Sequence, residues 1–159
     1  MQRRTAIERR AGEDAWQAVA LDGDVLTRLA PAEGLLAAAA VARERAQAPY
    51  SRFKVGAALE TSDGTIVVGC NVESASYGLT LCAERVALVT ALCGGHTSFV
   101  RLAVVADTER PTPPCGACRQ LLWEYCGDID VYLGNLETLA AHHRLQALLP
   151  LPFDRTLLE

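Results

Sequence analysis

Two kinds of apolar pattern alternate along this chain: short, nearly continuous runs and longer runs with helical spacing. The turn Ser62-Asp63-Gly64 separates two strand-like segments, and Gly94-Gly95 ends a mostly apolar helical segment. The pattern predicts strands at 53–60, 65–72, 101–106 and 129–133, and helices at 31–47, 81–93, 115–125 and 137–149, with a short helix at 15–21. This alternation predicts an α/β fold with helices on both faces of a sheet.

The length and charge of the chain narrow its class. Its 159 residues are enough for one domain with its own core. We expect residues 1–30 to be an N-terminal extension and residues 31–159 to be the domain. The formal net charge of −4 argues against a nucleic-acid partner, because such proteins present a basic face to phosphates. The longest apolar run, residues 35–42, is too short to cross a membrane. The arginines among the first ten residues precede no apolar signal core, so we expect a cytoplasmic protein.

Two short clusters carry the chemistry that stands out from this background. They are Leu81-Cys82-Ala83-Glu84-Arg85 and Pro114-Cys115-Gly116-Ala117-Cys118-Arg119-Gln120, and each places cysteines where a predicted helix begins. The unpaired N–H groups and the dipole of a helix start favour anions, so they stabilise thiolates. Three thiolates close together bind zinc, and three protein ligands leave one tetrahedral position for water. Cys82, Cys115 and Cys118 are therefore the predicted ligands of one Zn²⁺ per chain, with Glu84 beside the open position.

Other interpretations of the cysteines remain open at this stage. Cys115-x-x-Cys118 alone also fits a thiol–disulfide oxidoreductase or a structural zinc site. Combined with Cys82-x-Glu84, it matches the ligand-x-Glu and Pro-Cys-x-x-Cys pattern of zinc nucleobase deaminases in its three-cysteine form. Three thiolates leave the zinc site with net charge −1, so we expect the Arg85 guanidinium to donate to the sulfurs and offset it. The other cysteines, Cys70, Cys93 and Cys126, are interpreted as small buried apolar residues.

Beyond these motifs, the sequence resembles the small cytidine deaminases of pyrimidine salvage over roughly residues 31–153. The resemblance rests on a series of motifs in order: Ser51-Arg52-Phe53-Lys54-Val55-Gly56-Ala57-Ala58-Leu59, Gly69-Cys70-Asn71-Val72-Glu73, Ala75-Ser76-Tyr77-Gly78-Leu79-Thr80-Leu81-Cys82-Ala83-Glu84-Arg85, the second cysteine cluster, and Leu148-Leu149-Pro150 with Phe153. Family members usually have Asn where this chain has Ser74. A related group that deaminates blasticidin-type nucleosides typically lacks Arg85 and the Asn71/Glu73 pair, and is the alternative substrate class.

The resemblance implies a three-layer α/β/α sandwich with a mixed five-stranded sheet, assembled as a homotetramer. It implies that Asn71 and Glu73 contact the ribose, that Ala83 offers its backbone to the base, and that Phe53 packs on the pyrimidine. It places further substrate contacts at Ala75, and at Tyr77 and Phe153 from neighbouring subunits.

The expected activity is hydrolytic deamination of cytidine and deoxycytidine, with Glu84 as the general acid and base beside a zinc-activated water. The expected partner is therefore a small nucleoside, with no nucleic acid and no membrane. A polynucleotide deaminase needs a basic channel with stacking aromatics, whereas this chain is acidic and has only three Phe, two Trp and four Tyr.

Overall fold

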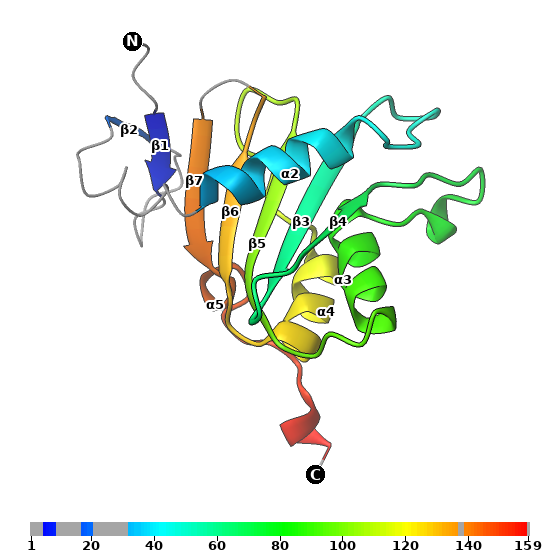
Figure 1. Cartoon of the computed structure of the whole chain (residues 1–159), viewed down its shortest axis with the longest axis vertical. Coiled ribbons are helices and arrows are strands. Elements are labelled where there is room, and N and C mark those ends of the chain that lie inside the picture. Colours follow the sequence, from blue (N-terminus) through cyan, green and yellow to red (C-terminus); the bar gives the residue numbers. More distant parts are fainter. Residues whose placement is uncertain (1–4, 9–16, 21–31, 137–138, 159) are drawn as a thin grey trace.

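A computed structural model describes residues 5–8, 17–20, 32–136 and 139–158 of the chain (Figure 1). Its centre is one mixed sheet with the strand order β2-β1-β7-β6-β5-β3-β4. The strands are β1 (Thr5–Glu8), β2 (Gln17–Ala20), β3 (Val55–Thr61), β4 (Ile66–Cys70), β5 (Phe99–Ala106), β6 (Asp130–Gly134) and β7 (Leu139–Arg144). The run from β7 to β4 is the predicted mixed five-stranded sheet, and β1 and β2 extend it at the β7 edge.

The pairing of the strands follows from the lengths of their connections. β3 and β4 form the predicted antiparallel hairpin across the turn that contains Gly64, whose φ of 85° suits glycine. β5 and β6 are parallel because a helix connects them, and β7 returns antiparallel to β6. β5 is nearly continuously buried from Leu102 to Ala106, as expected for a strand covered on both faces.

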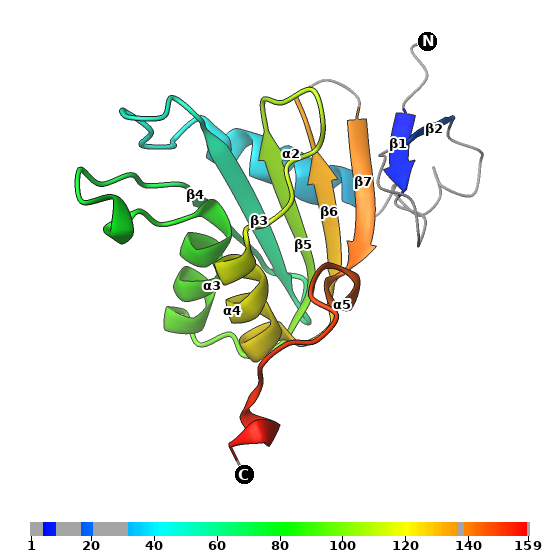
Figure 2. The ribbon, with the colours of Figure 1, turned by 180° about the vertical axis from the view of Figure 1, so that it is seen from behind.

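Helices cover the two faces of the sheet, so the predicted three-layer α/β/α arrangement is confirmed (Figures 1 and 2). Helix α2 (Glu33–Arg43) packs on one face through Leu35 and Ala39. Helices α3 (Ala83–Cys93) and α4 (Gly116–Cys126) pack on the other face, where Leu88 and Leu122 join the larger apolar core. A short helix, α5 (Leu145–Leu148), and a 3-10 helix, Arg155–Leu157, follow β7. Within the described part of the chain, none of the helices has the length and apolar character needed to cross a bilayer.

Two glycines allow helices to approach the sheet closely. A Cβ built on Gly56 would lie 1.9 Å from the Ala39 carbonyl oxygen of α2. A Cβ on Gly69 would lie 2.4 Å from the Ala83 oxygen and 2.4 Å from the Ala87 nitrogen of α3. Backbone atoms cannot yield as flexible side chains do, so only glycine lets α3 sit at this depth on β4. This contact fixes the start of α3, where the first cysteine cluster lies.

Two predicted helices are wrong. The segment 137–149 was predicted as one helix, but Leu139–Arg144 forms strand β7 and only Leu145–Leu148 is helical. Its alanines and leucines favour a helix locally, yet pairing with β6 from Ala140 to Arg144 overrides that preference. The segment 15–21 was predicted as a short helix, whereas Gln17–Ala20 is strand β2, paired antiparallel with β1. The rest of that segment lies outside the described residues.

Candidate metal centre and adjoining pocket

The three predicted zinc ligands converge at the starts of two helices, as expected. Cys82 is the N-cap of α3, Cys115 is the N-cap of α4, and Cys118 lies buried in the first turn of α4. Their Sγ atoms all lie within 4.8 Å of one another, with 3.9 Å between Cys82 and Cys115 and 3.5 Å between Cys115 and Cys118. Two sulfurs bound to one tetrahedral zinc, each about 2.3 Å from the metal, lie about 3.8 Å apart. The thiols therefore fit a Zn²⁺ ion with little movement.

Positive charge and helix geometry support thiolates in this cluster. The Arg85 guanidinium donates to Cys82 Sγ at 3.6 Å and to the Thr80 carbonyl at 2.9 Å. Hydrogen bonding by Cys118, and then by Arg85 and Cys115, lowers the pKa of Cys82 to about 5. The same pairing raises the pKa of Cys118, because its proton is held by the Cys82 thiolate. The predicted contact of Arg85 with a sulfur is thus present in the structure.

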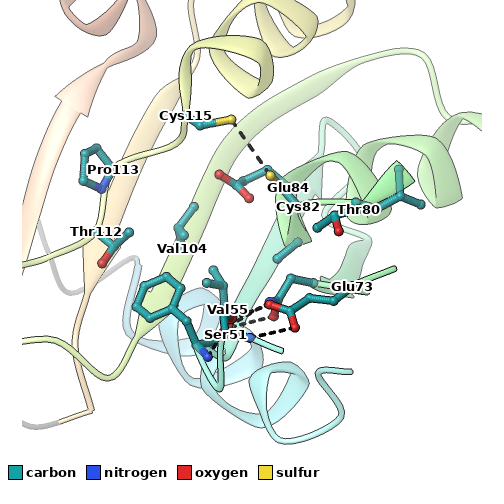
Figure 3. Close-up of a pocket in the computed structure, with 14 residues that line it drawn as sticks. Ser51, Val55, Glu73, Thr80, Cys82, Glu84, Val104, Thr112, Pro113 and Cys115 are labelled. Carbon is teal, nitrogen blue, oxygen red and sulfur yellow. Dashed lines mark hydrogen bonds between the residues drawn. The ribbon is translucent and has the colours of Figure 1, made fainter. Parts of the chain in front are cut away.

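Glu84 lies at the second position of α3, next to the thiols. Glu84 is only 4% exposed, although glutamate is an ionisable residue. Burial, opposed in part by hydrogen bonding to its own backbone N–H, raises the pKa of Glu84 to about 7. Figure 3 shows its carboxylate beside Cys82 and facing the open space of the pocket. A carboxyl group in this state can both accept and donate a proton near neutral pH.

A cavity of about 270 Å³ adjoins the thiols and gathers most of the predicted site residues. Its walls come from the loop before β3, the end of β4, the start of α3, β5 and the loop before α4 (Figure 3). The predicted residues that line it are Phe53, Asn71, Glu73, Cys82, Ala83, Glu84 and Cys115. Cys118 is fully buried and does not line the cavity. The cavity has the size and composition of a site for a small organic molecule beside a metal ion.

Asn71 and Glu73, predicted to bind a sugar, follow the end of β4 and also hold the opposite wall of the cavity. The Asn71 side chain accepts from the Val55 N–H at 2.8 Å and donates to the Phe53 carbonyl at 2.8 Å. Glu73 accepts from the backbone N–H groups of Tyr50 and Ser51 at 2.9 Å and 3.1 Å. Both side chains are therefore fixed before any ligand binds, which lowers the entropy cost of recognition.

Three predicted substrate contacts do not line this cavity within one chain. Ala75 and Tyr77 lie on the exposed loop before α3, and Tyr77 meets Tyr50 edge-to-face with ring centroids 6.0 Å apart. Tyr77 is 75% exposed and Phe153 is 57% exposed. Phe153 lies on the extended C-terminal segment, where its carbonyl accepts a hydrogen bond from Gln120 Nε2 at 2.5 Å. Figure 1 shows this segment leaving the body of the domain.

Some lining residues were not found by sequence reasoning. The cavity is also lined by Ser51, Val104, Thr112 and Pro113. In Figure 3, the last three lie on the wall that faces Glu84, and Ser51 lies below them. Val104 belongs to a buried strand, and its place in the wall depends on which strands neighbour it. Ser51 did carry a weak local signal, because a serine hydroxyl can bond the backbone two residues on, as it does here with the Phe53 N–H.

The remaining cysteines lie apart from this cluster of three thiols. Cys70 and Cys126 are half-buried, and burial raises the pKa of Cys126 to about 12, which makes it unreactive. Cys93 at the end of α3 is exposed, so its interpretation as a buried residue is wrong. It is the last residue of α3, where the local sequence does not determine exposure.

Comparison with known proteins agrees with this geometry. Residues 30–134 match the family model described as cytidine and deoxycytidylate deaminase zinc-binding region. The chain is 55% identical to a cytidine deaminase of Halalkalibacterium halodurans over 117 residues, which cover 73% of this chain and 89% of the relative. It is 51% identical to a cytidine deaminase of Sporosarcina psychrophila, covering 77% of this chain and 91% of the relative. The crystal structure of cytidine deaminase from Burkholderia pseudomallei superposes with a TM-score of 0.74 at 50% identity, covering 76% of this chain and 97% of that one.

Proposed function

The chain belongs to the cytidine deaminase family of zinc-dependent hydrolases, and we propose that it converts cytidine and deoxycytidine to uridine and deoxyuridine with release of ammonia. The observation that carries this proposal is the position of Glu84. Its buried carboxyl group lies beside three convergent thiols and inside a cavity large enough for a nucleoside. A redox pair or a structural zinc site needs no buried acid of this kind and no adjoining cavity.

The roles of the residues follow from this arrangement. Bound zinc supplies a Lewis acid that lowers the pKa of water, and Cys82, Cys115 and Cys118 would hold it. Glu84 takes a proton from the attacking water and passes it to ring N3 of the base. It then takes a second proton from the hydroxyl group newly bound to C4 and gives it to the amino group, so that the C4 carbonyl forms as ammonia leaves and the carboxyl group ends in its starting state. Its pKa of about 7 suits both directions of transfer.

The charge of the cavity supports a nucleoside rather than a nucleotide as substrate. The described residues that line it include no Lys or Arg, and their ionisable carboxyl groups are Glu73 and Glu84. The helix starts at the cavity already carry the thiols and Glu84, so a phosphate would find no cation to replace its water shell and would be repelled by the carboxylates. We therefore expect cytidine and deoxycytidine, not their monophosphates, to be turned over.

Recognition of the two halves of the nucleoside is divided between two groups of residues. Phe53 and the Ala83 backbone would contact the base, whereas Asn71 and Glu73 would contact the sugar. Ala75, on the loop that follows, is proposed as a further contact. The presence of Arg85, Asn71 and Glu73 together favours cytidine over blasticidin-type nucleosides as substrate.

We propose that the active enzyme is a homotetramer in which neighbouring subunits complete each site. The exposure of Tyr77 and Phe153 in one chain supports this, because large aromatic side chains are usually covered. Leu151 and Leu158 on the same C-terminal segment are 94% and 75% exposed, so the segment presents apolar surface that a second copy would bury. Residues 31–159 would form each catalytic domain, with residues 1–30 as an extension, and the enzyme would act in cytoplasmic pyrimidine salvage.

The test combines activity with assembly. Purified protein of measured zinc content should deaminate cytidine, followed by the ultraviolet absorbance change from cytosine to uracil, and should sediment at four times 17.0 kDa. Glu84→Gln and Phe153→Ala proteins, each inactive, should regain partial activity when they are dissociated and reassembled together. Activity in a stable monomer, or no recovery in mixed tetramers, would refute the shared site. Absence of cytidine turnover by zinc-loaded protein would refute the function.

A further inference from the structure

The Glu73 carboxylate is held by three donors from two consecutive residues, Tyr50 and Ser51. Oε2 accepts from the Tyr50 N–H at 2.9 Å and the Ser51 N–H at 3.1 Å. Oε1 accepts from the Ser51 hydroxyl, which is the one side-chain donor among the three (Figure 3). The two backbone bonds fix one oxygen of the carboxylate, so the rotation and direction of the other oxygen depend on Ser51.

The Ser51 hydroxyl is itself oriented by the backbone. The Phe53 N–H donates to Ser51 Oγ at 2.9 Å, which occupies a lone pair of the hydroxyl oxygen and directs its hydrogen toward Glu73. This turn requires an unusual conformation between the two residues: Arg52 has φ of 59°, the one positive φ at a non-glycine position among the described residues. Left-handed backbone at such a residue costs of order 1 kcal/mol and is found where surrounding contacts impose it.

We propose that Ser51 is a positioning residue for sugar recognition, which fixes Glu73 Oε1 so that it accepts a hydrogen bond from a sugar hydroxyl of the substrate. Ser51 lines the same cavity as Glu73 and Glu84 but lies on the wall opposite the metal ligands. Its effect is therefore on the selection of the sugar and not on proton transfer to the base. This inference rests on the proposed function, because Glu73 is assigned to the sugar there.

The state of the carboxylate agrees with this role. The Ser51 hydroxyl is the largest cause that holds the pKa of Glu73 below its usual range, and the N–H groups of Tyr50 and Ser51 add to it. An ionised carboxylate accepts hydrogen bonds only, so a sugar hydroxyl can donate to it but cannot be replaced by an acceptor. A ligand without the hydroxyl leaves the carboxylate partly unpaired, which is the physical basis of its rejection.

The experiment measures binding of cytidine and of 2′,3′-dideoxycytidine, which lacks both sugar hydroxyls, by titration calorimetry. Glu84→Gln protein is used throughout, so that neither ligand is turned over. Adding Ser51→Ala should raise the Kd of cytidine about 5- to 10-fold, the usual net weight of one hydrogen bond, and leave the Kd of the dideoxy compound within about 2-fold. In the active enzyme, Ser51→Ala should raise KM for cytidine by a similar factor with kcat nearly unchanged.

Three further variants separate positioning from general damage. Ser51→Thr keeps the hydroxyl and should keep the wild-type ratio of the two Kd values. Ser51→Cys, with a weaker donor of similar size, should give an intermediate ratio and replaces Ser51→Ala if that protein does not fold. Ser62→Ala removes a hydroxyl from the exposed β3–β4 turn and should change neither Kd.

An unchanged ratio of the Kd values in Ser51→Ala and Ser51→Cys, or an equal loss for both ligands, would overturn the inference. So would a further change in the ratio when Ser51→Ala is added to Glu73→Ala, because Ser51 would then act without Glu73. Failure of the proposed function has a different signature: wild-type protein that does not deaminate cytidine at all.

Discussion

Replacement of Glu84 by glutamine separates the chemistry of this site from its architecture. The side chain keeps its size and can still form hydrogen bonds, but it can no longer accept or release a proton. Positioned acid–base groups contribute about 10²- to 10⁴-fold, and Glu84 serves in more than one proton transfer, so kcat should fall by at least about two to four orders of magnitude. Zinc content should stay at one ion per chain, because the three thiols that hold it are unchanged.

The same substitution should raise the free energy of unfolding, although it lowers kcat. Burial raises the pKa of Glu84 from 4.5 to about 7, which corresponds to about 3 kcal/mol of free energy. A carboxyl group with a higher pKa in the folded state binds its proton more tightly there. The free energy of unfolding therefore falls as pH rises from about 4.5 to about 7, and stays lower above that range. Glutamine removes this penalty.

The assay compares stability at high and low pH, because the penalty of burying Glu84 is present only where its carboxyl group is ionised. In protein stripped of zinc with a chelator, Glu84→Gln should unfold at higher urea concentration than wild type at pH 8, and the difference should shrink toward zero as pH falls below about 4.5. Zinc-loaded samples of both proteins provide the activity measurement and the metal analysis. A Glu84→Gln enzyme that works within a few-fold of wild type would refute the mechanism. Equal stability of the two stripped proteins at pH 8 would show that Glu84 carries no burial penalty.

Three other predictions address the metal, the sugar and the fold. Cys118→Ala should lose zinc and activity together, measured by elemental analysis and deamination assay, and full zinc occupancy would remove this residue from the site. Free cytosine should be a very poor substrate because Asn71 and Glu73 would face an empty sugar position, so turnover equal to that of cytidine would contradict their assignment. Gly69→Ala should destabilise the protein by about 1–3 kcal/mol in urea unfolding, because its Cβ would overlap the α3 backbone. Gly34→Ala, on α2 with nothing within 4 Å, is the matched control and should be neutral or stabilising; equal losses in both would contradict the close-approach argument.

Much of the metal centre could be predicted from sequence because its determinants are local. Cys82 and Cys115 each cap a helix whose start is encoded by the residues around it. Cys118 and Glu84 are then placed by helix geometry one turn or less away. The chemical identity of three thiols and one carboxyl group specifies the rest, since few cations other than zinc suit such a set.

Most of the strands and helices were predictable for the same reason, except where pairing with a neighbouring strand determines the secondary structure. The hairpin of β3 and β4 and the buried run of β5 follow from short apolar runs and turn residues. The segment Leu139–Arg144 does not: its composition favours a helix, and it becomes β7 only because β6 offers a free edge. A strand is stabilised by its neighbour, which lies elsewhere in the sequence, whereas a helix forms its hydrogen bonds within itself.

The sequence by itself determined which residues could do chemistry, and the tertiary structure decided what holds them in place. Nothing in the linear order shows that Asn71 clamps the backbone of Phe53 and Val55, or that Ser51 and Glu73, separated by 22 residues, share a hydrogen bond. The order of residues also does not show that Tyr77 and Phe153 stay out of the pocket of their own chain. These contacts depend on the depth at which α3 packs on β4 and on the path of loops between elements. Such distances arise from the packing of the whole domain, so they become visible only when the chain is folded.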